Sequence, residues 1–348
     1  MAACDFHSRS SARLAGTTCK KERKSHREAE SRCFYPGALK IRWNVCRGQP
    51  GLAHIRQPLD VAVQFSSGSG TASLSGFGAY AALEIPLLDG DVVGGISGRN
   101  ETDGPAAPTA AVKLQPDGSL LPVPLFISGD AANISSLSTG SFMLVQKRVE
   151  FSDVPAGHFA EKAVYDLASR LILQGYQVNE PIAGLSEGAD RFEPGQPVTR
   201  AEFAQVMVRA LGLAGEAPQS SSFADVEPGA WYAAATDLAQ QYGILQGYAD
   251  GTYHPGNVLT RQEAMAIIAR SMKLAGVEIK AEAQELDGFA DGKLVSAWAQ
   301  PAAAALVKAG IIAGNGSELQ PFDPITRGEL AVMIRRRLIQ TSLINGDD

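Results

Sequence analysis

A four-residue pattern, Thr-Arg-X-Glu, occurs three times in this chain and constrains its fold more than any other feature. The copies are residues 199–202, 260–263 and 326–329. A threonine at the N-cap with a glutamate three residues later forms a capping box, so each copy predicts the start of a helix. Apolar residues follow each copy at offsets of three and four, which places them on one helix face. The sequence therefore predicts three capped helices, each with one buried face.

The arginine of the pattern has no part in the capping box. It stands at the first helical position, where the helix dipole disfavours a cation. Three arginines at that position predict that something anionic is held there, with the free N–H groups of the helix start as further donors. These arginines are Arg200, Arg261 and Arg327. The other interpretation is a salt bridge from each arginine to an aspartate of a neighbouring repeat. Binding would place the arginines at the surface, where substitution changes stability little.

From Phe151 onward the chain is a three-fold repeat, and each copy opens with Phe-X-Asp. A large aromatic residue, an alanine-rich helix, a glycine, a proline-containing loop and the capped helix follow in that order. The aspartates are Asp153, Asp225 and Asp291, the aromatic residues are Phe159, Trp231 and Trp298, and the glycines are Gly175, Gly247 and Gly314. Each glycine is predicted to end the first helix in a left-handed conformation. The first copy carries an insertion near residues 177–190.

Charge divides the chain into a basic start and an acidic body. Residues 1–50 hold 11 Lys and Arg against 4 Asp and Glu, whereas the remaining 298 residues hold 20 basic and 33 acidic side chains. The acidic body argues against a nucleic-acid partner. Residues 1–53 have no hydrophobic periodicity, so we expect a disordered or spurious segment and regard a basic nucleic-acid-binding arm as the less favoured interpretation.

The cysteines also separate the two parts. All of them lie in the basic segment, namely Cys4, Cys19, Cys33 and Cys46. Their spacing contains no C-x-x-C, so it favours a zinc site only weakly, and disulfides stay possible. A cysteine-free body is typical of a secreted bacterial surface protein, yet no signal peptide and no run of about 18 apolar residues is present. We expect a fragment, or a wrongly assigned start, whose export signal is missing.

Residues 54–150 carry the signals of a small antiparallel β domain. Strictly alternating residues at 59–65 predict a strand, and further strands are expected within 80–88, 112–114, 120–127 and 140–149. Ser/Gly-rich and Gly/Pro-rich stretches at 66–70 and 98–108 predict loops. Two tripeptides match the glycosylation pattern, at Asn100 and Asn133, but such matches are frequent by chance. The acidic residues lie mostly at predicted turns, so we expect no catalysis here.

The repeats resemble the S-layer homology repeat, a module that attaches surface proteins to bacterial cell walls. The resemblance rests on F-x-D-V, the aromatic residue, the mid-repeat glycine, the proline loop and T-R-x-E, which recur in order over residues 151–340. We assign the copies to residues 151–216, 217–280 and 281–348. The preceding segment resembles the β region that often adjoins this module in surface proteins of spore-forming Gram-positive bacteria. The fold class expected is α+β multidomain, with a β domain followed by an all-α bundle that the resemblance implies to be pseudo-three-fold.

The resemblance implies non-catalytic binding of secondary cell-wall polymer, a glycan bearing pyruvate ketals, in grooves between repeats. It implies an extracellular, wall-associated, monomeric anchor that needs no cofactor or metal. The implied ligand-binding positions are Arg200, Arg261, Arg327, Trp231, Trp298, Asp153, Asp225, Asp291, Gly175, Gly247 and Gly314. Structural roles compete at each one: aspartates before helices are usually caps, tryptophans are core anchors as often as sugar platforms, and the glycines are more often needed by the backbone.

The three sites need not be equivalent. The first repeat has Phe159 where the family favours Trp, and its insertion could cover or extend a groove. The third repeat has Asp291-Gly292 instead of Asp-Val and one extra residue before Trp298. The sequence therefore ranks the site of Arg261 first. Two other functions stay open: a C-terminal fragment of a surface glycan hydrolase whose catalytic domain lies upstream, and a self-assembling lattice protein, for which no large assembly domain is present.

Overall fold

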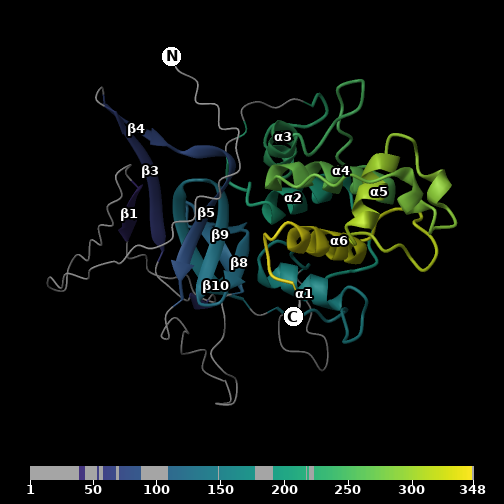
Figure 1. The fold of residues 1–348 in the computed structure, drawn as a ribbon, viewed down its shortest axis with the longest axis horizontal. Helices are drawn as coiled ribbons and strands as arrows, with labels where there is room; N and C mark the ends of the chain where they lie inside the picture. Colours follow the sequence, from purple (N-terminus) through teal and green to yellow (C-terminus); the bar gives the residue numbers. More distant parts are fainter. Residues whose placement is uncertain are drawn as a thin grey trace.

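The computed structural model describes residues 39–43, 53–54, 58–67, 70–87, 109–147, 149–176, 191–216, 218 and 223–346, and all structural statements below concern these residues. They form a β region followed along the chain by a helical region, which lie side by side in Figure 1. The Gly/Pro-rich stretch at 98–108, the insertion near 177–190 and Asn100 lie outside the described residues, so the predictions made for them stay untested.

The β region consists of antiparallel strands in two sheets. The strands are β1 (Leu39–Trp43), β2 (Ala53–His54), β3 (Leu59–Ser67), β4 (Gly70–Leu74), β5 (Gly76–Pro86), β6 (Ala110–Leu114), β7 (Leu120–Val123), β8 (Leu125–Ser128), β9 (Ala131–Ser138) and β10 (Gly140–Gln146). The larger sheet has the order β1-β3-β10-β6-β7, with β2 beside β10 and β4 beside β3. The smaller sheet has the order β5-β9-β8.

Most predicted strands are present, and the differences have local causes. Pro124 separates the expected strand at 120–127 into β7 and β8, which belong to different sheets. The central strand of the small sheet, β9, was not predicted, because its serines hide the alternation of buried residues. β1 pairs with β3 although it lies within residues 1–53, where we expected no structure. The larger sheet therefore extends across the predicted boundary at residue 54.

The helical region contains two α-helices per repeat. The helices are α1 (Glu161–Ser169), α2 (Arg200–Ala210), α3 (Ala233–Gln241), α4 (Arg261–Met272), α5 (Gln300–Lys308) and α6 (Arg327–Gln340), and the short 3-10 helices are η1 (Lys273–Ala275), η2 (Ala283–Leu286) and η3 (Gly292–Leu294). The helices α2, α4 and α6 begin at the three patterns, and both hydrogen bonds of the capping box are present at each start. The prediction of three capped helices is confirmed.

Helices pack between repeats more than within them. The second helix of each repeat packs against the first helix of the next, so α2 contacts α3 and α4 contacts α5. The order closes because α6, at the end of the chain, packs against α1, as Figure 1 also shows. One continuous core of buried apolar side chains runs through all three repeats. A single repeat therefore leaves the apolar faces of both of its helices without their partners.

Backbone hydrogen bonds at the start of each second helix form a closed ring. The N–H of Val198 donates to the carbonyl of Ile325 at 2.9 Å, that of Ile325 to Leu259 at 3.0 Å, and that of Leu259 back to Val198 at 2.9 Å. Each of these residues stands two positions before a motif arginine. Because every repeat both donates and accepts, the ring needs all three copies to close.

The helical region also contacts the β region directly. The Tyr80 hydroxyl of β5 donates to the carbonyl of Leu211 at 2.8 Å. The Asn345 side chain accepts from the N–H of Ile127 and donates to its carbonyl, both at 2.7 Å, which satisfies the open edge of β8. Lys113 of β6 forms an ion pair with Glu216 at 2.9 Å. The two regions therefore share a bonded interface.

Within the described residues, no helix combines the length and apolarity that a membrane span needs. Over the same residues, His, Cys, Asp and Glu side chains form no group of three or more that could hold a metal ion.

Candidate functional site

Each motif arginine reaches from its own repeat into the proline loop of another. The Nε atoms donate to backbone carbonyls, Arg200 to Tyr253 at 2.7 Å, Arg261 to Leu319 at 2.7 Å and Arg327 to Phe192 at 2.8 Å. Repeat 1 thus contacts repeat 2, repeat 2 contacts repeat 3, and repeat 3 contacts repeat 1. We name these contacts junction 1–2 (around Arg200), junction 2–3 (around Arg261) and junction 3–1 (around Arg327).

Two of these arginines are buried and paired with an internal carboxylate. Arg200 and Arg261 are only 5% and 4% exposed, so the expectation that they lie at the surface is wrong. Arg200 Nη1 lies 3.3 Å from Glu263 Oε1, and Arg261 Nη1 lies 2.5 Å from Glu329 Oε1. The partner is the capping-box glutamate of the next repeat, and not an aspartate as the salt-bridge alternative predicted.

The N–H groups at the helix starts are not free. The N–H of Arg200 donates to the carbonyl of Asn257 at 2.9 Å, and that of Ala201 to Pro255 at 3.0 Å. The other helices repeat this arrangement: Arg261 and Gln262 donate to Asp323 and Pro321, and Arg327 and Gly328 donate to Gln196 and Pro194. The expectation that these groups serve a ligand is therefore wrong, because the adjoining proline loop already accepts from them.

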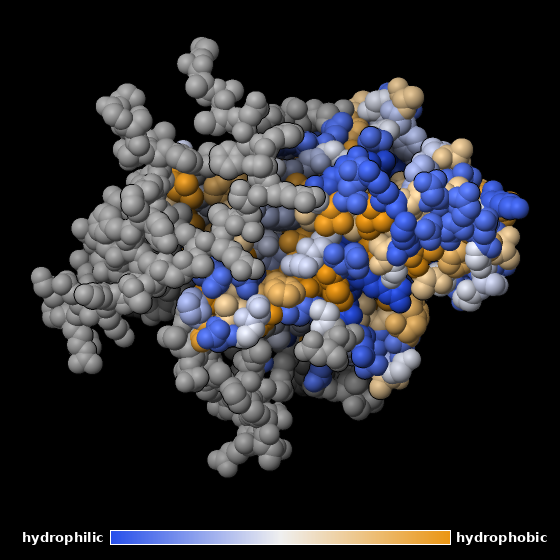
Figure 2. All heavy atoms as spheres, viewed as in Figure 1, coloured by the Kyte–Doolittle hydropathy of each residue, from blue (hydrophilic) through white to orange (hydrophobic). Residues whose placement is uncertain are grey.

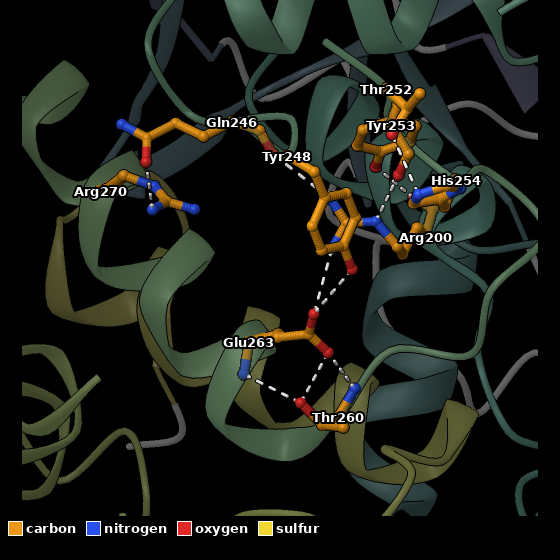
Figure 3. Close-up of polar contacts among 9 residues, drawn as sticks. All are labelled: Arg200, Gln246, Tyr248, Thr252, Tyr253, His254, Thr260, Glu263 and Arg270. Atoms are coloured by element: carbon orange, nitrogen blue, oxygen red, sulfur yellow. Dashed lines mark hydrogen bonds and ion pairs between the residues drawn. The ribbon is translucent and has the colours of Figure 1, made fainter. Parts of the chain in front are cut away.

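Figure 3 shows the polar contacts at junction 1–2. The guanidinium of Arg200 lies over the rings of Tyr248 and Tyr253, with its central carbon 4.9 and 4.6 Å from the ring centroids. Glu263 divides its two oxygens between roles. Oε1 accepts from Arg200 and, at 3.4 Å, from the Tyr248 hydroxyl, whereas Oε2 accepts from the Thr260 N–H at 2.8 Å. The helix cap and the arginine site thus share one carboxylate.

The aspartates of the Phe-X-Asp openings order the proline loop of their own repeat. Asp225 accepts from the N–H groups of Tyr253 and His254, both at 2.7 Å. Asp153 does the same for Phe192 and Glu193, and Asp291 for Leu319 and Gln320. Partial burial raises the pKa of Asp225, but the two N–H bonds outweigh it and hold that pKa below its ordinary value. The competing role suggested for these three aspartates, capping a helix, is therefore not the one that they have.

The mid-repeat glycines do not end the first helices. Those helices end six residues earlier, and the residues two positions after their ends, Leu171, Gly243 and Gly310, adopt left-handed φ values of 64°, 68° and 69°. At Gly247 a Cβ atom would lie 2.4 Å from the ring of Phe223, and at Gly314 it would lie 2.6 Å from that of Phe289. Gly247 is therefore needed because Phe223 packs against the backbone, and Gly314 is needed both for this reason and because its own φ, 69°, is left-handed.

The three aromatic residues before the first helices are exposed. Phe159, Trp231 and Trp298 are 64%, 63% and 58% exposed, so the interpretation as core anchors is wrong. On the face drawn in Figure 2, apolar residues of the helical region interrupt the hydrophilic surface in small patches. Phe159 lies against the start of α6, because a Cβ on Gly328 would lie 3.0 Å from its ring. Exposed flat apolar side chains at these positions suit stacking against a sugar ring.

Sequence reasoning missed two sets of residues. Tyr176 and Tyr248, which follow two of the mid-repeat glycines, cover the motif arginines Arg327 and Arg200. A second set of arginines recurs nine residues after the motif arginines and donates to carbonyls at the end of the preceding first helix; these are Arg209, Arg270 and Arg336. The recurrence of arginine at this spacing is the sequence signal that could have revealed the second set.

The repeats match a known family at the positions that build these junctions. A sequence model of the family described as "S-layer homology domain" matches residues 150–204, 222–265 and 288–331. The chain carries three S-layer homology domains. The resemblance noted in the sequence is thereby confirmed, and each match ends just after the motif arginine. S-layer homology domains bind cell-wall polymers and act as anchoring modules, which gives this chain a cell-surface or cell-wall location.

Three relatives match between 42% and 55% of this chain. The chain is 33% identical over 193 residues to an exoglucanase, XynX, of Acetivibrio thermocellus, covering 55% of this chain and 16% of the relative. It is 32% identical over 184 residues to the surface-layer 125 kDa protein of Lysinibacillus sphaericus, covering 52% and 14%. It is 29% identical over 156 residues to a cellulosome-anchoring protein of Acetivibrio thermocellus, covering 42% and 33%. The chain thus spans a third or less of the length of each of these three relatives.

Proposed function

We propose that the three S-layer homology domains hold a surface protein on the bacterial cell wall by binding a secondary wall polymer that bears pyruvate ketals. One observation carries the proposal. Each repeat presents an exposed aromatic side chain, and each junction contains a motif arginine that another repeat positions. A pyruvate ketal supplies a carboxylate for the guanidinium, and its sugar ring supplies a flat face for the aromatic side chain.

The closed order of contacts supports a pseudo-three-fold module. α1 packs on α6 as α3 packs on α2 and α5 on α4, and the backbone ring returns from repeat 3 to repeat 1. In such a module the binding residues come from two repeats at every junction. The aspartates and mid-repeat glycines then act through the loop that they order, because the carboxylates already accept from two N–H groups each.

A second candidate is a fragment of a surface glycan hydrolase, favoured by the similarity to an exoglucanase. This function would leave the binding role of the repeats unchanged and place catalysis in a further domain. The chromosomal sequence that precedes the codon of Met1 distinguishes the two. A catalytic glycosidase domain in the same reading frame would establish the second candidate.

Binding to wall sacculi tests the main proposal. The full chain is mixed with sacculi that retain their secondary polymer, and with matched sacculi from which the polymer has been removed by acid. We expect saturable binding to the first, little binding to the second, and competition by polymer freed from the first. Equal binding to both preparations would contradict the proposal, because it would place recognition on peptidoglycan itself.

A further inference from the structure

The three motif arginines differ in how their charge is compensated. Arg261 has a 2.5 Å ion pair with Glu329, and Arg200 has a longer one, 3.3 Å, with Glu263. Arg327 forms no ion pair with any described residue, and its two hydrogen bonds go to the carbonyls of Phe192 and Gln174, both at 2.8 Å. Carbonyls satisfy donors but carry no net charge. Among the described residues, Arg327 is therefore the motif arginine whose guanidinium has no carboxylate partner.

Arg327 is also the most accessible of the three. Arg200 and Arg261 are buried, whereas Arg327 is half-buried, and its hydrogen bond to Gln174 lies at the surface. Its Nη1 atom makes no hydrogen bond to a described residue. A carboxylate arriving from solvent could therefore accept from Nη1 without displacing an existing partner.

At junction 3–1 the capping-box glutamate, Glu202, interacts with Tyr176 instead of with the motif arginine. Glu202 keeps its cap, because its Oε2 accepts from the Thr199 N–H at 2.8 Å. Its carboxylate acts on the tyrosine that covers Arg327: burial and Glu202 raise the pKa of Tyr176, and Arg327 opposes this. At the other two junctions the equivalent glutamate is within ion-pair distance of the arginine. Among the residues that the structure describes, only the arginine of junction 3–1 thus has no carboxylate within ion-pair distance that would compete with a ligand carboxylate.

Aromatic surfaces flank the same guanidinium. Its central carbon lies 4.7 Å from the ring of Tyr176 and 4.6 Å from the ring of Phe192. Phe159, which is largely exposed, lies beside the neighbouring Gly328. Arg261 has no aromatic ring of the described residues over it. Junction 3–1 therefore combines a cation that has no carboxylate partner among the described residues with an exposed ring on which a sugar can stack.

We infer that junction 3–1 is the primary site for the carboxylate of the wall polymer. At junction 2–3 the ion pair of Arg261 with Glu329 takes the place of a ligand carboxylate. The inference rests on the proposed function, and it reverses the sequence-based ranking, which placed the site of Arg261 first. Because this site joins repeat 1 to repeat 3, it exists only when the ring of repeats has closed. The ligand class is a sugar bearing a carboxylate.

A titration with a small probe tests the inference on the full chain. The probe is a monosaccharide bearing a pyruvate ketal, and its methyl ester is the uncharged control. We expect about one strong site per chain for the acid, and affinity for the ester at least about tenfold lower, as for loss of a charge-assisted hydrogen bond. Three equal sites, or equal affinity for acid and ester, would overturn the inference.

Matched variants locate the site. Arg327→Gln should weaken binding of the acid at least about tenfold, and Arg261→Gln should weaken it less than Arg327→Gln does while lowering the melting temperature of the chain. Phe159→Ala and Trp298→Ala form a second pair, because both side chains are exposed and neither supports the core. Phe159→Ala should weaken binding severalfold, and by more than Trp298→Ala does. The reverse order in either pair would overturn the inference.

The sacculus assay separates this inference from the proposed function. If wild-type chain binds sacculi only when they carry polymer, but Arg327→Gln and Phe159→Ala bind as wild type does, only the assignment to junction 3–1 fails. If wild-type chain does not depend on the polymer, the proposed function fails and this assignment fails with it.

Discussion

At the scale of single residues, the aspartate of Phe-X-Asp shows how one side chain can order a whole loop. Asp225 holds two consecutive N–H groups, of which the second belongs to His254, a residue with a left-handed φ of 53°. Such a backbone conformation is costly for a residue other than glycine and needs support from its surroundings. The equivalent residues Glu193 and Gln320 have φ values of 58° and 53° and the same aspartate bonds.

Replacing this carboxylate should cost stability in a pH-dependent way. Asp225→Asn gives up two charge-assisted bonds, so we expect a loss of about 2 kcal/mol at neutral pH. The pKa of Asp225 is lower in the folded chain than its ordinary value, so its contribution is complete above roughly pH 4 and fades as pH falls through the folded pKa. Urea unfolding between roughly pH 2 and 7, a range that spans the ordinary pKa of an aspartate, should show the free energies of unfolding of the two proteins converging in acid.

A constant difference between Asp225→Asn and wild type across that range would contradict this account. It would mean that the substitution acts through packing instead of through the charged form of the carboxyl group.

At the scale of elements, the ends of the first helices are set by a left-handed residue that differs between repeats. Repeats 2 and 3 use Gly243 and Gly310, whereas repeat 1 uses Leu171. Leucine is unfavourable in this conformation, but its side chain is buried against Ala110, Val112 and Val145 of the β region. The same position therefore ends a helix in every repeat, and in repeat 1 it also attaches the helical region to the larger sheet.

Substitution of the glycine that follows α3 should measure only the free-energy cost of placing a side chain on a left-handed backbone. A Cβ at Gly243 would touch nothing within 4 Å, so Gly243→Ala should cost about 1–2 kcal/mol from the left-handed backbone. Gly256→Ala is the matched control, since that position is equally open and its φ is not left-handed. We expect the control to stay within about 0.5 kcal/mol of wild type in urea unfolding. Similar losses at both positions would show that φ does not decide the effect.

At the scale of the whole molecule, stability depends on closing the ring of repeats. Repeat 3 supplies Ile325 to the backbone ring, α6 to the packing against α1, and Asn345 to the edge of β8. Removing it exposes apolar surface on α1 and α4 at once. Each repeat alone offers two short helices, which is too little core for a unit of this size, below about 70–80 residues.

A chain truncated after Lys280 should therefore fail to unfold cooperatively. Differential scanning calorimetry of the truncated chain should show no sharp transition near the melting temperature of the full chain, and its light scattering should rise on heating. A cooperative transition at the full-length temperature would mean that repeats 1 and 2 fold independently, and the closed order of contacts would then be unimportant for stability.

Local patterns in the sequence determined the elements of the repeat. Capping boxes, apolar spacing and turn residues act over a few positions, so the starts at Thr199, Thr260 and Thr326 and most strands could be predicted. The family could be recognised for the same reason, because its motifs are short and recur in order. The glycines were misassigned because both roles, a left-handed turn and a close contact, require the same residue.

Only the tertiary structure decided what the motif arginines touch. Their partners lie far along the chain, 53 residues from Arg200 to Tyr253 and 135 from Arg327 to Phe192. Burial, charge compensation and accessibility at each arginine depend on which repeat packs beside it, and three nearly identical motifs therefore have three different environments. Sequence gives each arginine the same neighbours in the chain, but its electrostatic environment is set by groups that only the closed ring brings within a few ångströms.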